Sequence, residues 1–157
     1  MNHKVITIDG PSGVGKGTIA IMIAKELGYN YLDSGSLYRS LALKLYEINN
    51  NFDEVLKNLD YWISDIAIDF RYKEGQKAQI FVNNEDFTDK IRTEKVAILA
   101  SNIAKDPIAR DMLENYQRKY LSAPGLVADG RDMGTKVFSD ANTKFYLTAS
   151  IEKRAER

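Results

Sequence analysis

The chain has 157 residues, of which 44% are hydrophobic and 28% are charged, as is usual for one globular domain. Its 22 basic and 22 acidic residues cancel, so no net charge attracts a nucleic acid or an anionic membrane surface. There is no cysteine, the single histidine is His3, and no apolar run reaches membrane length, which argues against disulfides, Cys- or His-ligated metals and a membrane span.

The first predicted elements are a strand at 4–8, a glycine-rich loop and a helix at 18–27. The loop reads Gly-Pro-Ser-Gly-Val-Gly-Lys-Gly-Thr from 10 to 18, and it holds four glycines in eight positions, more than an ordinary surface turn needs. Such a loop binds nucleotide phosphates, because inward-pointing N–H groups, a helix N-terminus and a lysine all attract anions. The strict form of the motif has Ser or Thr where this chain has Gly17.

The residues expected to bind ATP phosphates are Gly10, Ser12, Gly13, Gly15, Lys16, Gly17 and Thr18. Two roles are possible for Thr18. Its hydroxyl contacts a phosphate or a metal-bound water, or it serves only as the hydroxyl at a helix N-terminus.

The next segments predict a strand at 29–32 and helices at 37–48 and 53–64. In the first helix, Ile19, Ile23 and Leu27 form an apolar stripe, and Gly28 is expected to end it.

Alternating apolar residues then predict an antiparallel insert at 65–90, with strands at 66–72 and 78–82, a turn at 73–76 and a tight turn at Asn83-Asn84. The domains expected are therefore a core of 1–64 and 91–157 and an insert of 65–90. Pattern alone leaves open whether the insert is a hairpin decoration or a functional subdomain.

The second half predicts a helix at 93–105 capped by Thr93 and another from 107, indicated by Asp106 and Pro107. Strands follow at 126–129 and 144–147, and Ser150 caps a last helix. Strands that alternate with helices favour an α/β fold with a parallel sheet. Ligands bind such sheets at the carboxyl ends of the strands, so segments 10–18, 33–39 and 129–134 are expected to converge on one site.

Lys16, Arg131 and Asp129 are the predicted catalytic residues. Arginine recognises phosphate through a planar pair of donors. Asp129 is expected to orient an arginine or to hold magnesium through water. The alternative interpretation is a purely structural ion pair between Asp129 and a nearby arginine. A loop lysine with several arginines and no obvious nucleophile or water-positioning glutamine favours phosphoryl transfer to a second phosphate-bearing substrate.

Four blocks, at 6–18, 32–39, 91–93 and 128–135, resemble the bacterial cytidylate kinases, and the resemblance runs through the chain in the right order. The Gly-Lys-Gly-Thr form of the loop is itself typical of nucleoside monophosphate kinases, which accounts for Gly17. The resemblance implies a three-layer P-loop kinase core, with the 65–90 insert corresponding to the monophosphate-binding subdomain.

The resemblance also implies transfer of the γ-phosphate of ATP to CMP or dCMP with Mg²⁺. No protein side chain is expected to ligate the magnesium directly; ATP and water would hold it near Thr18. Arg39 and Arg131 would hold the acceptor phosphate and Lys16 the donor, and Ser34, Ser101, Arg110 and Asp132 would read the cytosine. The expected CMP-binding set is Ser34, Tyr38, Arg39, Ser101, Arg110, Gly130, Arg131 and Asp132. We expect a cytoplasmic monomer with no nucleic-acid or membrane partner.

The family continues beyond Arg157 with an arginine-rich lid, a last core strand and a final helix, so the resemblance implies a truncated chain with the lid and last strand absent. Weak or no catalysis and an unpaired sheet edge are then expected. Two alternatives remain: a kinase of another small acceptor such as AMP, shikimate or an antibiotic, and a non-catalytic nucleotide-binding module without its lid. A GTPase-like switch is disfavoured because the chain has no Asn-Lys-x-Asp sequence.

Overall fold

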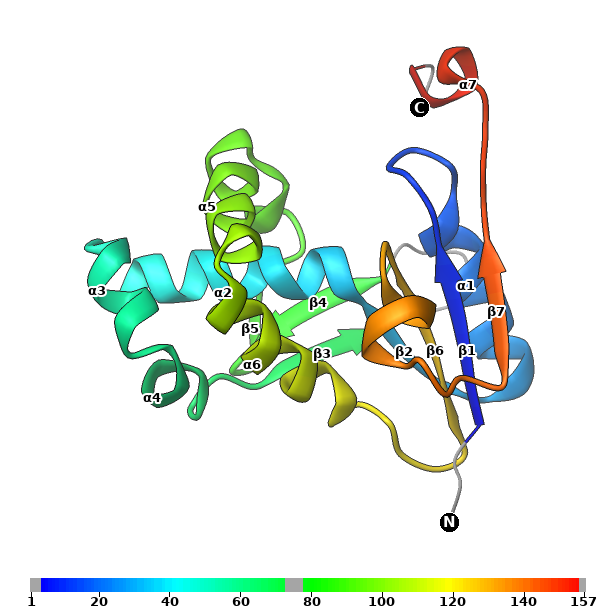
Figure 1. The fold of residues 1–157 in the computed structure, drawn as a ribbon, viewed down its shortest axis with the longest axis horizontal. Coiled ribbons are helices and arrows are strands. Elements are labelled where there is room, and N and C mark those ends of the chain that lie inside the picture. The colour runs from blue at the N-terminus through cyan, green and yellow to red at the C-terminus, as the bar shows by residue number, and fades with distance from the viewer. Residues whose placement is uncertain (1–3, 73–77, 156–157) are drawn as a thin grey trace. The chain divides into compact units, whose positions relative to one another are not determined.

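The computed structural model describes residues 4–72 and 78–155, which form two compact units (Figure 1). The first unit comprises Met1–Ser34 and Asn115–Arg157, and the second comprises Gly35–Glu114. His3 and the turn expected at 73–76 lie outside the described residues.

The first unit contains a four-stranded parallel sheet in the order β2-β6-β1-β7, which confirms the predicted α/β fold (Figure 1). Its strands are β1 (Lys4–Asp9), β2 (Asn30–Asp33), β6 (Gly125–Gly130) and β7 (Thr143–Tyr146). In this register Asp33 lies opposite Asp129, and Asp9 lies opposite Gly130 on one side and Tyr146 on the other. The carboxyl ends of all four strands therefore meet at one edge, where the sequence predicts the site.

Helix α1 (Lys16–Leu27) packs against β6 through Ala20 and Ala24, which are fully buried. The predicted apolar stripe is wrong, because Ile19 is 39% and Leu27 46% exposed. A helix that lies close to a sheet needs small side chains at the contact, so the two alanines occupy that face. The described part of this unit also contains a π-helical segment, η2 (Met133–Val137), and α7 (Ile151–Ala155), which Ser150 caps as predicted.

Gly28 ends α1 in the left-handed conformation, with φ 63°, as predicted. A methyl group at this position would meet no atom within 4 Å, so only backbone strain opposes a side chain. We therefore expect Gly28→Ala to lower the free energy of unfolding by about 1–2 kcal/mol. Urea unfolding with an unchanged m-value is the measurement. Gly28→Asn is the matched control and should lose less, because asparagine tolerates this conformation; equal losses in both variants would contradict the explanation.

The second unit contains several helices and a small antiparallel sheet in the order β3-β4-β5 (Figure 1). Its strands are β3 (Ile68–Arg71), β4 (Gln79–Val82) and β5 (Glu85–Asp86). Asn83 and Asn84 have φ 48° and 67°, which confirms the predicted tight turn. Its helices are α2 (Ser34–Ile48, whose first residue belongs to the first unit), α3 (Phe52–Lys57), α4 (Leu59–Ile63), η1 (Lys90–Arg92), α5 (Glu94–Lys105) and α6 (Pro107–Arg118, which ends in the first unit).

Local capping signals are confirmed in this unit, whereas one predicted helix is wrong. Thr93 accepts a hydrogen bond from the Val96 N–H and Asp106 from the Ala109 N–H, and these bonds start α5 and α6. The helix predicted at 53–64 is instead broken at Asn58. The Asn58 side chain donates to the Glu54 carbonyl oxygen at 3.3 Å, so it competes with the backbone for that acceptor.

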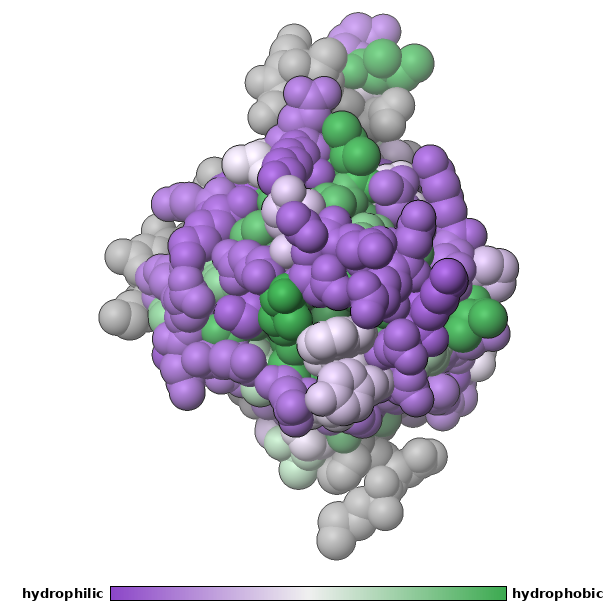
Figure 2. All heavy atoms as spheres, turned by 90° about the vertical axis from the view of Figure 1, so that its left-hand side faces the viewer, coloured by the Kyte–Doolittle hydropathy of each residue, from purple (hydrophilic) through white to green (hydrophobic). Residues whose placement is uncertain are grey.

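Figure 2 shows the side of the molecule on which α3 and α4 lie in Figure 1. Hydrophilic residues cover most of this face, and the hydrophobic ones are interspersed among them. Such a mixture is ordinary for a surface in contact with water. Among residues 4–72 and 78–155, no helix has the length and apolar character needed to cross a membrane.

Candidate active site

The glycine-rich loop connects the end of β1 to the start of α1, as predicted. Gly13 and Gly15 have φ 80° and 91°, which side chains other than glycine rarely adopt, and these values let the backbone fold back on itself. Gly15 occupies the N-cap of α1 and has no side chain with which to cap it. The first N–H groups of α1 therefore remain suitable for an anion, and the helix dipole favours negative charge at the same end.

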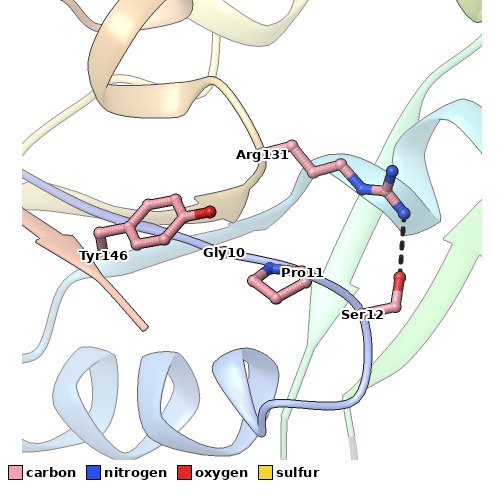
Figure 3. Close-up of a pocket in the computed structure, with 5 residues that line it drawn as sticks. All are labelled: Gly10, Pro11, Ser12, Arg131 and Tyr146. Atoms are coloured by element: carbon pink, nitrogen blue, oxygen red, sulfur yellow. Dashed lines mark hydrogen bonds between the residues drawn. The ribbon is translucent and has the colours of Figure 1, made fainter. Parts of the chain in front are cut away.

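A pocket of about 430 Å³ opens at this loop, lined by Gly10, Pro11, Ser12, Arg131 and Tyr146 (Figure 3). The Arg131 guanidinium donates to the Ser12 hydroxyl at 2.9 Å, so a residue predicted to hold the acceptor phosphate lies against the glycine-rich loop. Figure 3 shows the Tyr146 ring beside Gly10, with its hydroxyl directed into the pocket. Tyr146 comes from the end of β7, and no sequence signal marked it as a site residue.

Lys16 is half-buried, and its ammonium donates to the Pro11 carbonyl oxygen at 2.9 Å, within the same loop. Burial lowers the pKa of Lys16, while the negative charge of Asp129 acts in the opposite direction. A loop carbonyl is an acceptor that a nucleotide phosphate can replace, so the structure keeps this ammonium at the place where phosphate is expected.

Asp129 is buried at the end of β6, and its carboxylate accepts a 2.7 Å hydrogen bond from the Tyr31 hydroxyl. Burial, followed by the charge of Asp33, raises the pKa of Asp129 to about 7. Burial likewise raises the pKa of the Tyr31 phenol, so Tyr31 is the hydrogen donor of the pair. A methyl group on Gly17 would lie 3.5 Å from the Tyr31 hydroxyl and 3.7 Å from a carboxylate oxygen of Asp129, which brings the loop and the pair together.

Tyr31 and Asp9 also belong to the candidate site, although neither is among the residues that the sequence predicts for it. Tyr31 is one of several apolar or aromatic residues in a strand and carries no distinguishing pattern. Asp9 ends β1, is only 6% exposed, and accepts hydrogen bonds from the backbone N–H groups of Met133 and Gly134. The only feature of the sequence that could have indicated Asp9 is its position directly before the glycine-rich loop.

Ser34 and Gly130, both in the predicted CMP-binding set, lie together in the first unit. A methyl group on Gly130 would lie 3.2 Å from the Ser34 β-carbon, so the two backbones approach closely. The Ser34 side chain is buried, with 7% of the residue exposed. Asp132 is half-buried and lies directly before η2 in the chain. The first unit therefore contains the glycine-rich loop together with Ser34, Gly130, Arg131 and Asp132.

The remaining predicted CMP-binding residues belong to the second unit: Tyr38 and Arg39 on α2, Ser101 on α5 and Arg110 on α6. The Arg39 guanidinium donates to the Ile91 carbonyl oxygen at 3.1 Å, within one of the blocks that carried the resemblance. Ser101 and Arg110 are exposed. Their roles stay predictions.

Mg²⁺ usually keeps several waters and binds through substrate phosphates with one or two carboxylates. The loop is suited to this mode of magnesium binding. Thr18 is exposed on the first turn of α1, and the Asp129 carboxylate lies close to Gly17, the residue before Thr18. In the part of the chain that the structure describes, no cluster of three His, Cys, Asp or Glu side chains is suited to a metal.

Comparison with known proteins identifies the family. The family model for cytidylate kinase matches residues 6–157. The cytidylate kinase of Pseudomonas aeruginosa (strain LESB58) is 49% identical over 164 residues, which cover 100% of this chain and 69% of that protein. Those of Marinomonas sp. (strain MWYL1) and Acinetobacter baylyi are 48% and 45% identical and cover 98% and 100% of this chain, and 67% and 70% of their own lengths.

A crystal structure of TT1252 from Thermus thermophilus aligns with a TM-score of 0.45 at 20% identity, covering 99% of this chain and 71% of that one. The family assignment rests on the sequence matches, which extend over essentially the whole chain. The chain belongs to the cytidylate kinase family.

Proposed function

We propose that the chain transfers the γ-phosphoryl group of ATP to CMP or dCMP, forming CDP or dCDP. The observation that carries this proposal is the membership of the cytidylate kinase family together with a phosphate loop that meets Arg131 at one pocket. The chain is thus a nucleoside monophosphate kinase, a transferase. A second phosphate-bearing substrate explains why an arginine lies against a loop that already has its own lysine.

The donor side of the reaction is assigned to the loop. Its backbone N–H groups and the N-terminus of α1 bind the phosphates of ATP, and Lys16 leaves the Pro11 carbonyl to neutralise charge that develops during transfer. Mg²⁺ bound with ATP supplies further positive charge at the phosphate oxygens. The residues assigned to ATP are Gly10, Ser12, Gly13, Gly15, Lys16, Gly17 and Thr18.

The acceptor side is assigned to the CMP-binding set. Arg131 holds the acceptor phosphate and, through Ser12, keeps it next to the donor loop. Arg39 shares that role, and Ser34, Ser101, Arg110 and Asp132 read the base. Phosphoryl transfer asks the protein mainly to align the two substrates and to neutralise charge, which these residues are suited to do. A monomer in the cytoplasm, with Mg²⁺ as cofactor, completes the proposal.

The test is transfer of label from γ-labelled ATP to CMP, dCMP, AMP and UMP, each over a range of concentrations. We expect kcat/KM for CMP or dCMP to exceed that for AMP by about 10²-fold or more, because a site that hydrogen-bonds one base leaves polar groups unpaired with another. Equilibrium titration of the same nucleotides checks the ranking without turnover. A preference for AMP over CMP and dCMP, in transfer or in equilibrium binding, would contradict the proposal.

A further inference from the structure

The Asp9 carboxylate uses both of its oxygens to bind one short stretch of backbone. Oδ1 accepts from the Met133 N–H and Oδ2 from the Gly134 N–H, each at 2.8 Å. These are the first two N–H groups of η2, which have no acceptor within their own helix. Hydrogen bonds to a buried carboxylate are among the stronger ones in proteins, and the loss of one leaves a buried donor unpaired.

The geometry of η2 depends on this close approach. The Phe138 N–H donates to the Met133 carbonyl oxygen at 2.7 Å, the i to i+5 spacing of a π-helix. A methyl group on Gly134 would lie 2.5 Å from the Thr7 hydroxyl oxygen and 3.3 Å from Oδ2 of Asp9. Only glycine therefore lets the backbone of η2 come near enough to β1 for both hydrogen bonds to form.

Arg131 and Asp132 lie between the end of β6 and this anchored turn. Gly130 pairs with Asp9 in the sheet register, and Met133 is held by the Asp9 carboxylate, so both ends of this two-residue segment are fixed to the same residue. Asp9 also directly precedes Gly10, the first residue of the phosphate loop. The Arg131 side chain is exposed and donates to Ser12 of that loop.

We propose that Asp9 is a positioning residue that holds Arg131 and Asp132 in place relative to the phosphate loop. In this role, which rests on the proposed function, Asp9 sets the acceptor side of the reaction without touching a substrate. One carboxylate at the end of β1 thus fixes two segments that are far apart in the sequence and that must align two phosphates. A displacement of about 1 Å in such an alignment is enough to slow a reaction strongly.

The test replaces Asp9 with asparagine, which keeps the shape but turns one accepting oxygen into an NH₂ group that faces a backbone N–H. We expect the KM for CMP to rise about 10-fold or more and kcat to fall, while the KM for ATP changes less than about threefold, since one buried hydrogen bond to a charge is lost on the acceptor side. Amide hydrogen exchange at Met133 or Gly134 should become faster in this variant.

The matched control is Val5→Ala, which removes a buried side chain from the same face of β1 and lowers stability without touching the carboxylate. We expect it to lower the melting temperature but to leave both KM values and the exchange at Met133 and Gly134 unchanged. If Asp9→Asn keeps a normal KM for CMP in an active enzyme, or keeps both amides protected, the positioning role is wrong. A wild-type chain that prefers AMP to CMP instead overturns the proposed function, and the acceptor-side role with it.

Discussion

Replacing Asp129 with asparagine is expected to stabilise the folded chain above neutral pH and to lower its phosphoryl-transfer rate. The pKa of Asp129 is raised from its ordinary value of 3.8 to about 7, first by burial and then by the charge of Asp33. Between these two values the folded state binds more protons than the unfolded state. Stability contributed by the protonated carboxyl is therefore lost as pH rises through this window, and the loss is complete above about pH 7.

Asparagine does not ionise, so the variant escapes this loss. At about 1.4 kcal/mol for each pKa unit, the gain in the free energy of unfolding at pH 8 is about 4 kcal/mol at most. The amide oxygen of the introduced asparagine can still accept the Tyr31 hydrogen bond. Removing the charge beside Lys16 should at the same time lower activity about 10–100-fold, as the loss of a supporting carboxylate commonly does.

Urea unfolding from pH 5 to pH 9 measures the stability of both forms, and label transfer to CMP measures their activity. Asp33→Asn provides the control: it removes the neighbouring negative charge, so the pKa of Asp129 should fall and the loss of stability should be complete at lower pH. Parallel pH profiles for wild type and Asp129→Asn would show that the ionisation of this carboxyl does not govern stability.

The features that the sequence predicts correctly are those set by neighbours along the chain. Thr93 and Asp106 start α5 and α6 through bonds to N–H groups three residues away, and Gly28 ends α1 by its own backbone conformation. The place of the glycine-rich loop between β1 and α1 belongs to the same class, because its glycines, lysine and flanking elements are contiguous.

The features that the sequence misses depend on contacts between distant residues. Tyr31 binds Asp129 across 98 positions, and Asp9 binds Met133 across 124 positions, so no local pattern in the chain marks either bond. The predicted apolar stripe of α1 is wrong for a related reason. Ala20 and Ala24 face the sheet because space there is short, which is a property of the packed structure and not of hydrophobic periodicity.

Lys16→Met should abolish most phosphoryl transfer while leaving the fold intact. Methionine keeps the apolar stem but removes the positive charge that we propose meets the phosphates, so we expect kcat to fall about 10²–10³-fold and the KM for ATP to change much less. Lys16→Arg should rescue little, because a planar guanidinium does not fit where a half-buried ammonium fits. Stability should change little, since the ammonium donates to a loop carbonyl and burial disfavours its charge.

Lys25→Met, in the last turn of the same helix, is the matched control and should keep wild-type kcat. A second readout comes from Asp129, because the charge of Lys16 lowers the pKa of that carboxyl. In Lys16→Met the pKa of Asp129 should therefore rise further, which carbon-13 NMR of the carboxyl group can follow. If kcat stays within about threefold of wild type, the loop does not act through its lysine, and the assignment of the donor side to Lys16 is wrong.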